Sequence, residues 1–269
     1  MPELPEMETY RLLLERKLAG RTIRRASVQR EKSVNLDPRA FEAAVVSRTV
    51  TGLSRRGKHL LFHLSDGNVL LLHLMLGGLM FFGTEREKPA RTVQVTLSVD
   101  EGNLYFIGLR LGYLHLLAEQ EAQAKLSRLG PEPLAPEFTP DVLKSRLASK
   151  SAAVKQALTD QQTIAGIGNC YADEICFAAG VLPHRKIPSL NGKEYAALYT
   201  AIQDVLQEAV RYGGYMEMPL FEGDHLTGGF DSRCRIYDRG GEPCVRCGAL
   251  IVQEELSSRK MFYCPHCQR

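Results

Sequence analysis

Four cysteines near the C-terminus constrain the fold of this 269-residue chain more than any other feature. They form two pairs, with two residues inside each pair and sixteen between the pairs: Cys244, Cys247, Cys264 and Cys267. This spacing is typical of a zinc ribbon, in which each pair sits on a tight turn and the segment between them forms a β-hairpin. We therefore predict one structural zinc ion bound by four thiolates. A redox role is the alternative, although no βαβ pattern surrounds the pairs.

The predicted zinc is structural rather than catalytic, because a closed shell of four cysteines leaves no open position for water. Zinc binding contributes roughly 10 to 16 kcal/mol to the folding of comparable peptides, which have too little core of their own. Arg259 and Lys260 lie at or near the expected tip of the hairpin. Such a tip suits phosphate contact, and a solvated basic turn is the alternative.

Length and composition exclude several classes of protein. The chain is long enough for two domains or one large one. No apolar run approaches the roughly 18 residues of a membrane span, and the N-terminus lacks the pattern of a secretory signal. Net charge is only +3, so nucleic-acid binding has to be argued from particular residues. We expect a soluble cytoplasmic protein that works as a monomer and not on a membrane.

The N-terminus carries a candidate nucleophile. Trimming of Met1 would leave a secondary amine on Pro2, and an α-amino group has a reference pKa of only about 7.7 to 8. Neutral amines attack electrophilic carbons and form Schiff bases with sugar aldehydes. Glu3 and Glu6 are close enough in sequence to supply acid and base groups if a helix starts near Pro5. The alternatives are an ordinary helix start, and a retained methionine that blocks the amine.

The spacing of apolar residues separates a β-rich part from a helical part. A helix is predicted over residues 4–18, and the period then shortens towards two. The predicted strands cover residues 22–29, 49–53, 59–64, 69–73, 92–99 and 103–107. A proline-rich linker follows at 130–136, and the predicted helices cover 141–148, 152–159, 171–179 and 192–212. The pattern predicts an α+β multidomain chain: an N-terminal helix with a β-sandwich, then a helical domain and the zinc ribbon.

A glycine pair precedes one of the predicted helices. Gly166 and Gly168 stand two residues apart, and Asn169 follows them. Such glycines let backbone amides converge at a helix N-terminus, where Asn169 either caps the helix or donates to a phosphate. An ordinary hairpin between helices is equally compatible with the pattern.

Five segments together resemble one known family. They are Pro2–Glu6, Arg56–Lys58, Leu129–Leu134, Asp160–Glu174 and Phe262–Gln268, and they occur in family order along nearly the whole chain. The chain resembles the formamidopyrimidine-DNA glycosylase and endonuclease VIII family, as a divergent member. The resemblance implies four parts: a catalytic β-sandwich domain at 1–130, a linker with the start of the helical domain at 131–150, a helix-two-turns-helix domain at 151–230 and a zinc finger at 231–269.

The resemblance also implies a reaction. In this family the N-terminal proline attacks C1′ of a nucleotide flipped out of damaged DNA, expels the base and forms an imine, after which elimination nicks the strand. Pro2 would be the nucleophile and Glu3 the acid that helps to open the sugar. Glu6 would be a supporting carboxylate. Lys58 would contact the phosphate beside the lesion and assist proton transfer, and a solvated turn lysine is its alternative.

Further positions correspond to DNA contacts in the family. Asn169 and Arg259 would hold the phosphates that flank the lesion. Lys155 falls on a family position near the DNA. Tyr237 falls on a backbone-contact position, where a packing tyrosine is equally expected. The implied partner is damaged DNA, duplex or single-stranded, in a bacterial-type, nucleoid-associated setting.

One functional layer departs from the family pattern. Family members fill the hole left by the flipped base with a methionine, an arginine and a phenylalanine. Here Leu76 occupies the methionine position, unless Met75 substitutes for it, and Arg110 fits the arginine position. Gly112 stands where we expect the phenylalanine, and Tyr113 comes one residue late, on the opposite face of a strand. Stabilisation of a flipped base should therefore be weaker.

The loop after the last predicted helix also departs from the pattern. Residues 215–225 are apolar and acidic, whereas enzymes for oxidised guanine carry a threonine-rich segment there. We therefore expect a lesion other than 8-oxoguanine, such as a bulky or alkylated base, a crosslink, a single strand, or a site where the duplex is already distorted. A non-catalytic protein that binds damaged DNA on the same scaffold is the second hypothesis. A zinc-ribbon protein with RNA or protein partners is the third.

Overall fold

The structure, a computed structural model, describes every residue from Met1 to Arg269 and contains two compact units. The first unit comprises Met1–Arg128 and Tyr212–Gly229, and the second comprises Leu129–Arg211 and Phe230–Arg269. No helix combines the length and the apolar character that crossing a bilayer requires.

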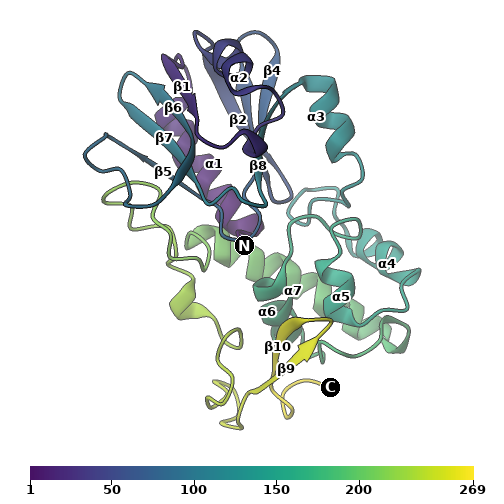
Figure 1. Cartoon of the computed structure of the whole chain (residues 1–269). Coiled ribbons are helices and arrows are strands. Elements are labelled where there is room, and N and C mark those ends of the chain that lie inside the picture. The colour runs from purple at the N-terminus through teal and green to yellow at the C-terminus, as the bar shows by residue number, and fades with distance from the viewer. The chain divides into compact units, whose positions relative to one another are not determined.

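The first unit is a β-sandwich with a long N-terminal helix (Figure 1). Its helices are α1 (Leu4–Leu18), α2 (Pro38–Val45) and α3 (Glu119–Leu126), with a 3-10 turn η1 (Glu31–Ser33). Its strands are β1 (Arg25–Val28), β2 (Val50–Arg56), β3 (His59–Leu64), β4 (Asn68–His73), β5 (Leu79–Gly83), β6 (Val93–Val99), β7 (Gly102–Ile107) and β8 (Tyr113–Ala118). Antiparallel pairing orders them as β1-β6-β7-β5 in one sheet and β2-β3-β4-β8 in the other.

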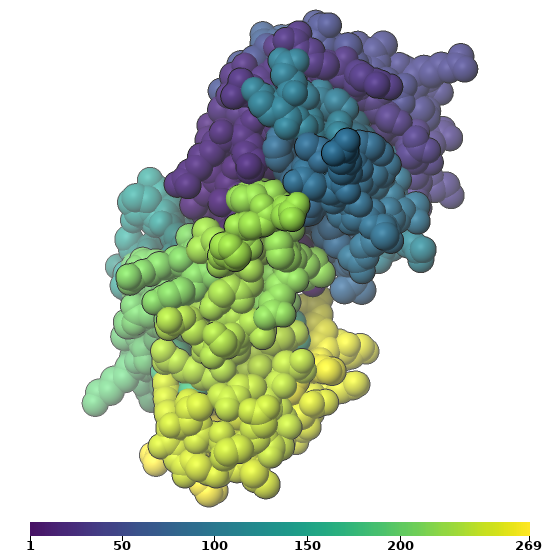
Figure 2. Space-filling model, turned by 90° about the vertical axis from the view of Figure 1, so that its left-hand side faces the viewer, coloured from purple at the N-terminus to yellow at the C-terminus, as the bar shows by residue number.

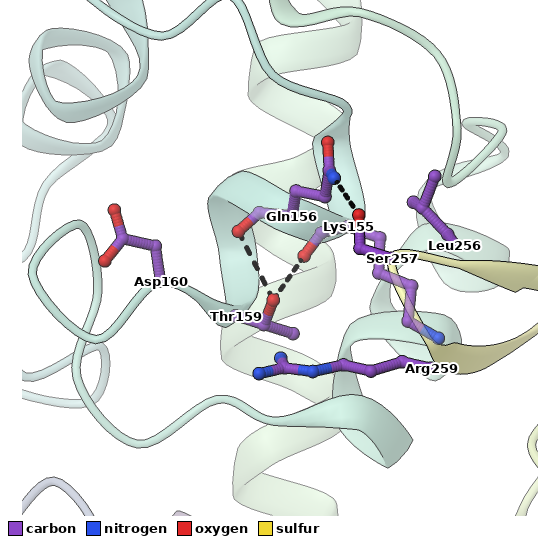
Figure 3. Close-up of a pocket in the computed structure, with 7 residues that line it drawn as sticks. All are labelled: Lys155, Gln156, Thr159, Asp160, Leu256, Ser257 and Arg259. Carbon is purple, nitrogen blue, oxygen red and sulfur yellow. Dashed lines mark hydrogen bonds between the residues drawn. The ribbon is translucent and has the colours of Figure 1, made fainter.

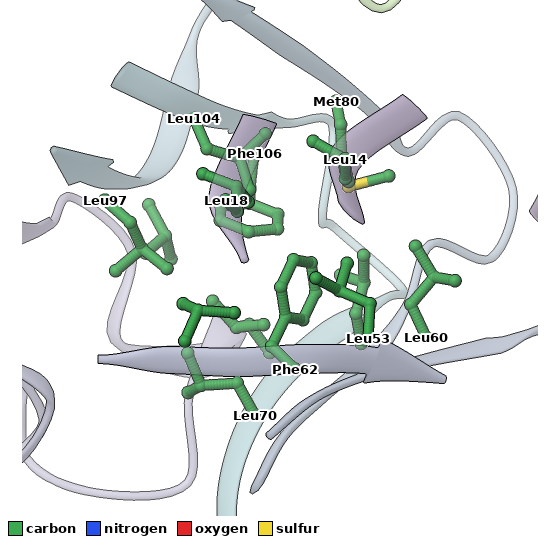
Figure 4. Packing of buried hydrophobic residues seen from close by; sticks show 14 of the residues in the cluster. Leu14, Leu18, Leu53, Leu60, Phe62, Leu70, Met80, Leu97, Leu104 and Phe106 are labelled. Atoms are coloured by element: carbon green, nitrogen blue, oxygen red, sulfur yellow. The ribbon is translucent and has the colours of Figure 1, made fainter. Parts of the chain in front are cut away.

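The apolar faces of both sheets and of α1 form one core (Figure 4). Leu14 and Leu18 of α1 are buried between side chains of the two sheets. Phe62 from β3 and Phe106 from β7 meet edge to face, with 6.3 Å between their ring centroids. Alternation along the strands places such residues inward, which is why period-two spacing predicted this part of the fold.

Four elements of the first unit are absent from the prediction: α2, α3, β5 and β8. Helix α2 has only eight residues, too few for a clear period, and it begins at a cap in which Asp37 accepts from the amides of Arg39 and Ala40. Strand β5 shows no alternation of apolar and polar residues, because both of its faces are covered. Phe81 packs with Met218 on the face opposite the main core.

The second unit contains four helices and a C-terminal hairpin (Figure 1). They are α4 (Pro140–Ala148), α5 (Val154–Thr159), α6 (Asn169–Ala179) and α7 (Gly192–Arg211), then β9 (Val252–Leu256) and β10 (Arg259–Tyr263), with 3-10 turns η2 (Ile187–Ser189) and η3 (Asp231–Arg233). Helix α6 ends at Gly180, whose φ of 70° is left-handed, as a helix C-cap commonly requires. The fold class predicted from the sequence, sandwich, helical domain and zinc hairpin, is confirmed.

The stretch Tyr212–Gly229 follows a helix of the second unit but packs in the first. Leu220 is fully buried in the sandwich core, and its carbonyl accepts from the amide of Phe82 at 2.6 Å. Asp224 holds the turn together by accepting from the amides of Leu220, Leu226 and Thr227. Figure 2 shows the yellow-green atoms of this stretch against the blue atoms of the sandwich.

Candidate active site

The carboxylate of Glu6 connects the N-terminus of the chain to the stretch Tyr212–Gly229. One of its oxygens accepts from the amide of Glu3 at 2.7 Å, and the other accepts from the amide of Tyr215 at 2.8 Å. Pro2, Glu3 and Glu6 are all buried, with 2% of Glu3 and 0% of Glu6 exposed. Because α1 begins at Leu4, Glu6 lies in its first turn, where the helix dipole favours a negative charge. Pro2 and Glu3 are therefore held in a defined position.

Gly214 is required by this arrangement. Its φ is +75°, and a Cβ at this position would lie 2.2 Å from a carboxylate oxygen of Glu6. Any side chain would therefore displace the carboxylate that holds the N-terminal turn. The Gly213-Gly214 pair, which the sequence indicates only as the end of a helix, thus has a second role.

Lys58 occupies a tight hairpin turn between β2 and β3. Gly57 supplies the left-handed φ of +56° at the first turn position, and Lys58 is only 5% exposed. Arg55 supports the turn by donating to the carbonyl of Gly57 at 3.0 Å and to Glu8 of α1 at 2.9 Å. Burial raises the pKa of Glu8, but hydrogen bonds from Arg11 and Arg55 outweigh it and lower the pKa overall. Glu8 thus ties α1 to the Lys58 turn.

A row of aromatic side chains crosses the sheet next to Lys58, and sequence reasoning did not find it. His59, His73, Tyr113 and His115 follow one another across β3, β4 and β8, and the first two rings stack with centroids 4.2 Å apart. Burial and, to a smaller extent, the positive charge of Lys58 together lower the pKa of His73 to about 4. Burial also lowers the pKa of His59 to about 3. These imidazoles are therefore neutral at physiological pH.

Two exposed leucines lie where the family wedge is expected. Leu76 is 68% exposed and Leu111 is 63% exposed, and both line a hollow of about 560 Å³ together with Arg110. A Cβ on Gly112 would lie only 2.4 Å from the carbonyl oxygen of His73, so the backbone leaves no room for a phenylalanine. Leu111, which we did not predict as a site residue, is the exposed apolar side chain of this loop. In the sequence, the one signal for Leu111 was its position directly after Arg110.

Asn169 begins helix α6 in the second unit. The preceding Gly166 has a φ of +93°, and its amide donates to Gln161 at 2.8 Å. The side-chain oxygen of Asn169 is buried and has no hydrogen-bond partner. An anion at this turn would be bound by the backbone amides at the N-terminus of α6 and not by this oxygen, which can only accept hydrogen bonds.

Lys155 and Arg259 line a hollow of about 290 Å³ between α5 and the hairpin (Figure 3). The ammonium of Lys155 donates to Asp173 at 2.7 Å and to the carbonyl of Lys260 at 2.6 Å, and the residue is only 2% exposed. Burial raises the pKa of Asp173 despite the lysine charge beside it. Arg259 forms no ion pair, and its guanidinium extends towards Thr159. The two cations differ, since Arg259 is available to a ligand and Lys155 is engaged inside the unit.

Tyr237 is held by a buried carboxylate that sequence reasoning also missed. Glu174 accepts from the amides of Arg235, Ile236 and Tyr237 at 2.9 to 3.0 Å. Burial raises the pKa of Glu174, although these three amides act in the opposite direction. The Tyr237 ring meets Phe262 edge to face, with 5.5 Å between centroids.

The four C-terminal cysteines converge on one point. Their sulfur atoms all lie within 4.8 Å of one another, with 3.8 Å between Cys244 and Cys267 and 3.5 Å between Cys247 and Cys264. A tetrahedral zinc ion with bonds of about 2.3 Å places its sulfur ligands about 3.8 Å apart. The cluster therefore fits the predicted zinc ion, and the zinc-ribbon prediction is confirmed.

Comparison with known proteins gives the family. Three family models match successive parts of the chain: the formamidopyrimidine-DNA glycosylase N-terminal domain over residues 1–113, its H2TH domain over 129–218, and the zinc finger found in FPG and IleRS over 241–269. The formamidopyrimidine-DNA glycosylase of Desulfitobacterium hafniense is 37% identical over 272 residues, covering 100% of both chains. The chain belongs to the formamidopyrimidine-DNA glycosylase family. It is thus a zinc-finger DNA glycosylase of the base excision repair type.

Other relatives also match this chain along its full length. The Geobacillus kaustophilus enzyme is 38% identical over 275 residues, covering 100% of both chains. Among solved structures, the Lactococcus lactis Fpg in complex with DNA containing an abasic site has a TM-score of 0.93 and 28% identity over 99% of both chains. The same protein in complex with Fapy-dG DNA has a TM-score of 0.92 and 28% identity, covering 99% of this chain and 100% of that one. The family resemblance stated from the sequence is confirmed.

Proposed function

We propose that this glycosylase also cleaves abasic DNA, and that the amine of Pro2 is its nucleophile once Met1 is removed. The observation that carries the proposal is the pair of hydrogen bonds that Glu6 accepts from the amides of Glu3 and Tyr215. A nucleophile reacts fast only when it is held in attack geometry, and here a buried carboxylate fixes the backbone one residue after Pro2. A chain that only binds DNA has no need of such a turn.

The chemistry follows from an amine beside two acids. The nitrogen of Pro2 attacks C1′ of the flipped nucleotide as the bond to the base breaks, and the base leaves with that electron pair and a proton. Opening of the sugar, assisted by a proton from Glu3, gives a positively charged iminium between the nitrogen of Pro2 and C1′. Loss of a proton from C2′ then expels the 3′ phosphate and cuts the strand. In this proposal Lys58, on its supported turn, binds the flanking phosphate.

In the second unit we propose that Asn169 and Arg259 bind the phosphates beside the lesion. The position of Asn169 at the N-terminus of α6 and the guanidinium of Arg259, which forms no ion pair, support this role. Lys155 has a different role in our proposal. Its ammonium holds the carbonyl of Lys260, so it positions the hairpin that carries Arg259 and does not contact DNA directly.

We propose a lesion preference that differs from standard 8-oxoguanine. Two features support it: the stretch Tyr212–Gly229 docks on the sandwich through the buried Leu220, and aliphatic Leu76 and Leu111 stand in place of the usual wedge. Aliphatic side chains stack less well on bases than a phenylalanine does. DNA already distorted by a bulky or alkylated base costs less to open and suits this site. Efficient excision of 8-oxoguanine opposite cytosine would refute the preference.

Borohydride trapping on DNA that contains an abasic site tests the nucleophile. We expect the mature protein to become crosslinked, and Pro2→Gly or a form that retains Met1 to trap little or nothing. Binding without trapping by the mature protein would instead indicate a damage-recognition protein without lyase activity. Processed N-termini must be confirmed by mass spectrometry, since a retained methionine imitates an inactive enzyme. We further propose that the protein acts on DNA as a monomer in the bacterial cytoplasm.

A further inference from the structure

Two neighbouring hollows on the first unit share one residue. The first is the hollow lined by Leu76, Arg110 and Leu111. The second, of about 690 Å³, lies on the β1-β6-β7-β5 sheet, on the face away from the sandwich core. Arg91 lines both hollows. A ligand that extends from one hollow to the other would pass this arginine.

We call the second hollow the outer-sheet groove. Its floor is polar. Neighbouring strands place Ser98 opposite Asn103, and Ser98 donates to Asn103 at 2.6 Å. Asn103 donates in turn to the hydroxyl of Tyr105 at 2.9 Å, and that hydroxyl lies 3.1 Å from Glu85. These groups hold one another in place, so the floor is a preformed hydrogen-bonding surface.

The rim of the outer-sheet groove carries an excess of positive charge. Arg25, Lys88 and Arg91 line it, with Glu85 as the single acid. Lys88 pairs with Glu85 at 3.1 Å, whereas the guanidinium groups of Arg25 and Arg91 form no ion pair. Two uncompensated guanidinium groups on a polar cavity favour an anionic ligand, and their planar donors match phosphate oxygens.

We propose that the outer-sheet groove binds the phosphates of a single DNA strand that leaves the duplex at Leu76 and Leu111. The strand passes Arg91 and reaches Arg25 on β1. A mononucleotide would occupy one hollow only, and the shared arginine favours a ligand that spans both. Exposed leucines beside cations suit unpaired nucleotides, which present both the apolar faces of their bases and their phosphates. The inference rests on the proposed DNA contact at Leu76 and Leu111, and it adds a binding site for forked or partly unwound DNA.

Fluorescence anisotropy with the full-length, zinc-loaded protein tests the groove. One DNA is a blunt duplex with an abasic-site analogue, and the other carries an added single-stranded tail of about ten thymidines that begins beside the analogue. We expect the tailed DNA to bind more tightly. Arg25→Gln should weaken tailed DNA about fivefold and reduce the slope of log affinity against log salt by about 0.7, the value for one phosphate contact on a single strand. Blunt duplex binding should not change.

Arg24→Gln is the matched control. It removes the same charge from the adjacent position, but Arg24 is held by Asp100 at 2.9 Å and does not line the groove. Equal effects of the two substitutions on tailed DNA, or no advantage of the tail, would overturn the inference. Displacement of the tail by thymidine monophosphate, with the blunt duplex still bound, would indicate a mononucleotide site and also overturn it.

The same assay separates this inference from the proposed function. If the protein traps on the blunt abasic duplex while Arg25→Gln leaves tailed DNA unaffected, only the groove proposal fails. If the protein neither binds nor traps either DNA, the proposed function fails and the groove proposal fails with it.

Discussion

Replacing Gly214 by alanine should disable the active site by way of Glu6. The new methyl group would lie 2.2 Å from one carboxylate oxygen and 2.7 Å from the carboxyl carbon, so Glu6 has to move and the bond from the Tyr215 amide is lost. A left-handed φ costs alanine roughly 1 kcal/mol or slightly more. Losing a buried hydrogen bond to a charged group costs about 1.5 to 3 kcal/mol in addition. We expect a total loss of about 3 to 4 kcal/mol in the free energy of unfolding.

Gly20→Ala isolates the contact from the backbone strain. Gly20 has a φ of +79°, close to the +75° of Gly214, and a Cβ there meets nothing within 4 Å. Calorimetry should therefore show Gly214→Ala melting roughly 4 to 12 °C below Gly20→Ala, at about 2 to 4 °C per kcal/mol for a unit of this size. Well below its melting temperature, Gly214→Ala should also trap abasic DNA at least about tenfold more slowly, because a shift of about 1.4 kcal/mol in the barrier suffices.

A double-mutant cycle completes the test. Once Glu6→Ala has removed the carboxylate, adding Gly214→Ala should cost only the backbone strain seen in Gly20→Ala. The coupling between the two positions should thus reach about 2 kcal/mol. Melting temperatures for Gly214→Ala and Gly20→Ala within about 2 °C of each other would refute the reasoning, since the contact with Glu6 would then carry no energy.

Four further predictions concern other parts of the chain. Lys155→Met leaves the buried Asp173 carboxylate without its partner and should cost about 3 to 5 kcal/mol in urea unfolding, most of which Asp173→Asn should restore when added to it. Burial lowers the pKa of His73 to about 4, so the unfolded chain takes up a proton that the folded chain does not, and stability should fall as pH drops from about 6.5 towards 4. Lys58→Met should raise the pKa of His73 in an NMR titration, because a neighbouring positive charge is removed; an unchanged value would place the two groups too far apart to interact. Chelating the zinc should remove hydrogen-exchange protection from β9 and β10 while strands of the first unit stay protected, and protection that survives would show that the hairpin folds without metal.

Features that depend on local spacing could be predicted from the sequence. The interval between the cysteine pairs indicated the zinc hairpin, because two tight turns on one hairpin bring four thiolates to one ion. The apolar period indicated α1 and most strands of the sandwich, since a period of 3.6 or 2 decides which face of an element is buried. The segments at Pro2, Lys58 and Asn169 indicated the family.

The remaining features depend on contacts between residues far apart in the sequence. No local pattern indicates that Glu6 accepts from Tyr215, or that Gly214 must be glycine because a carboxylate lies 2.2 Å from its Cβ position. The sequence around Lys155 is the same whether the side chain faces DNA or Asp173. Only the packing of the second unit shows that it faces Asp173. Spacing along a chain determines the hydrogen bonds and faces within one element, whereas the partner of a buried charge is decided by which elements meet in three dimensions.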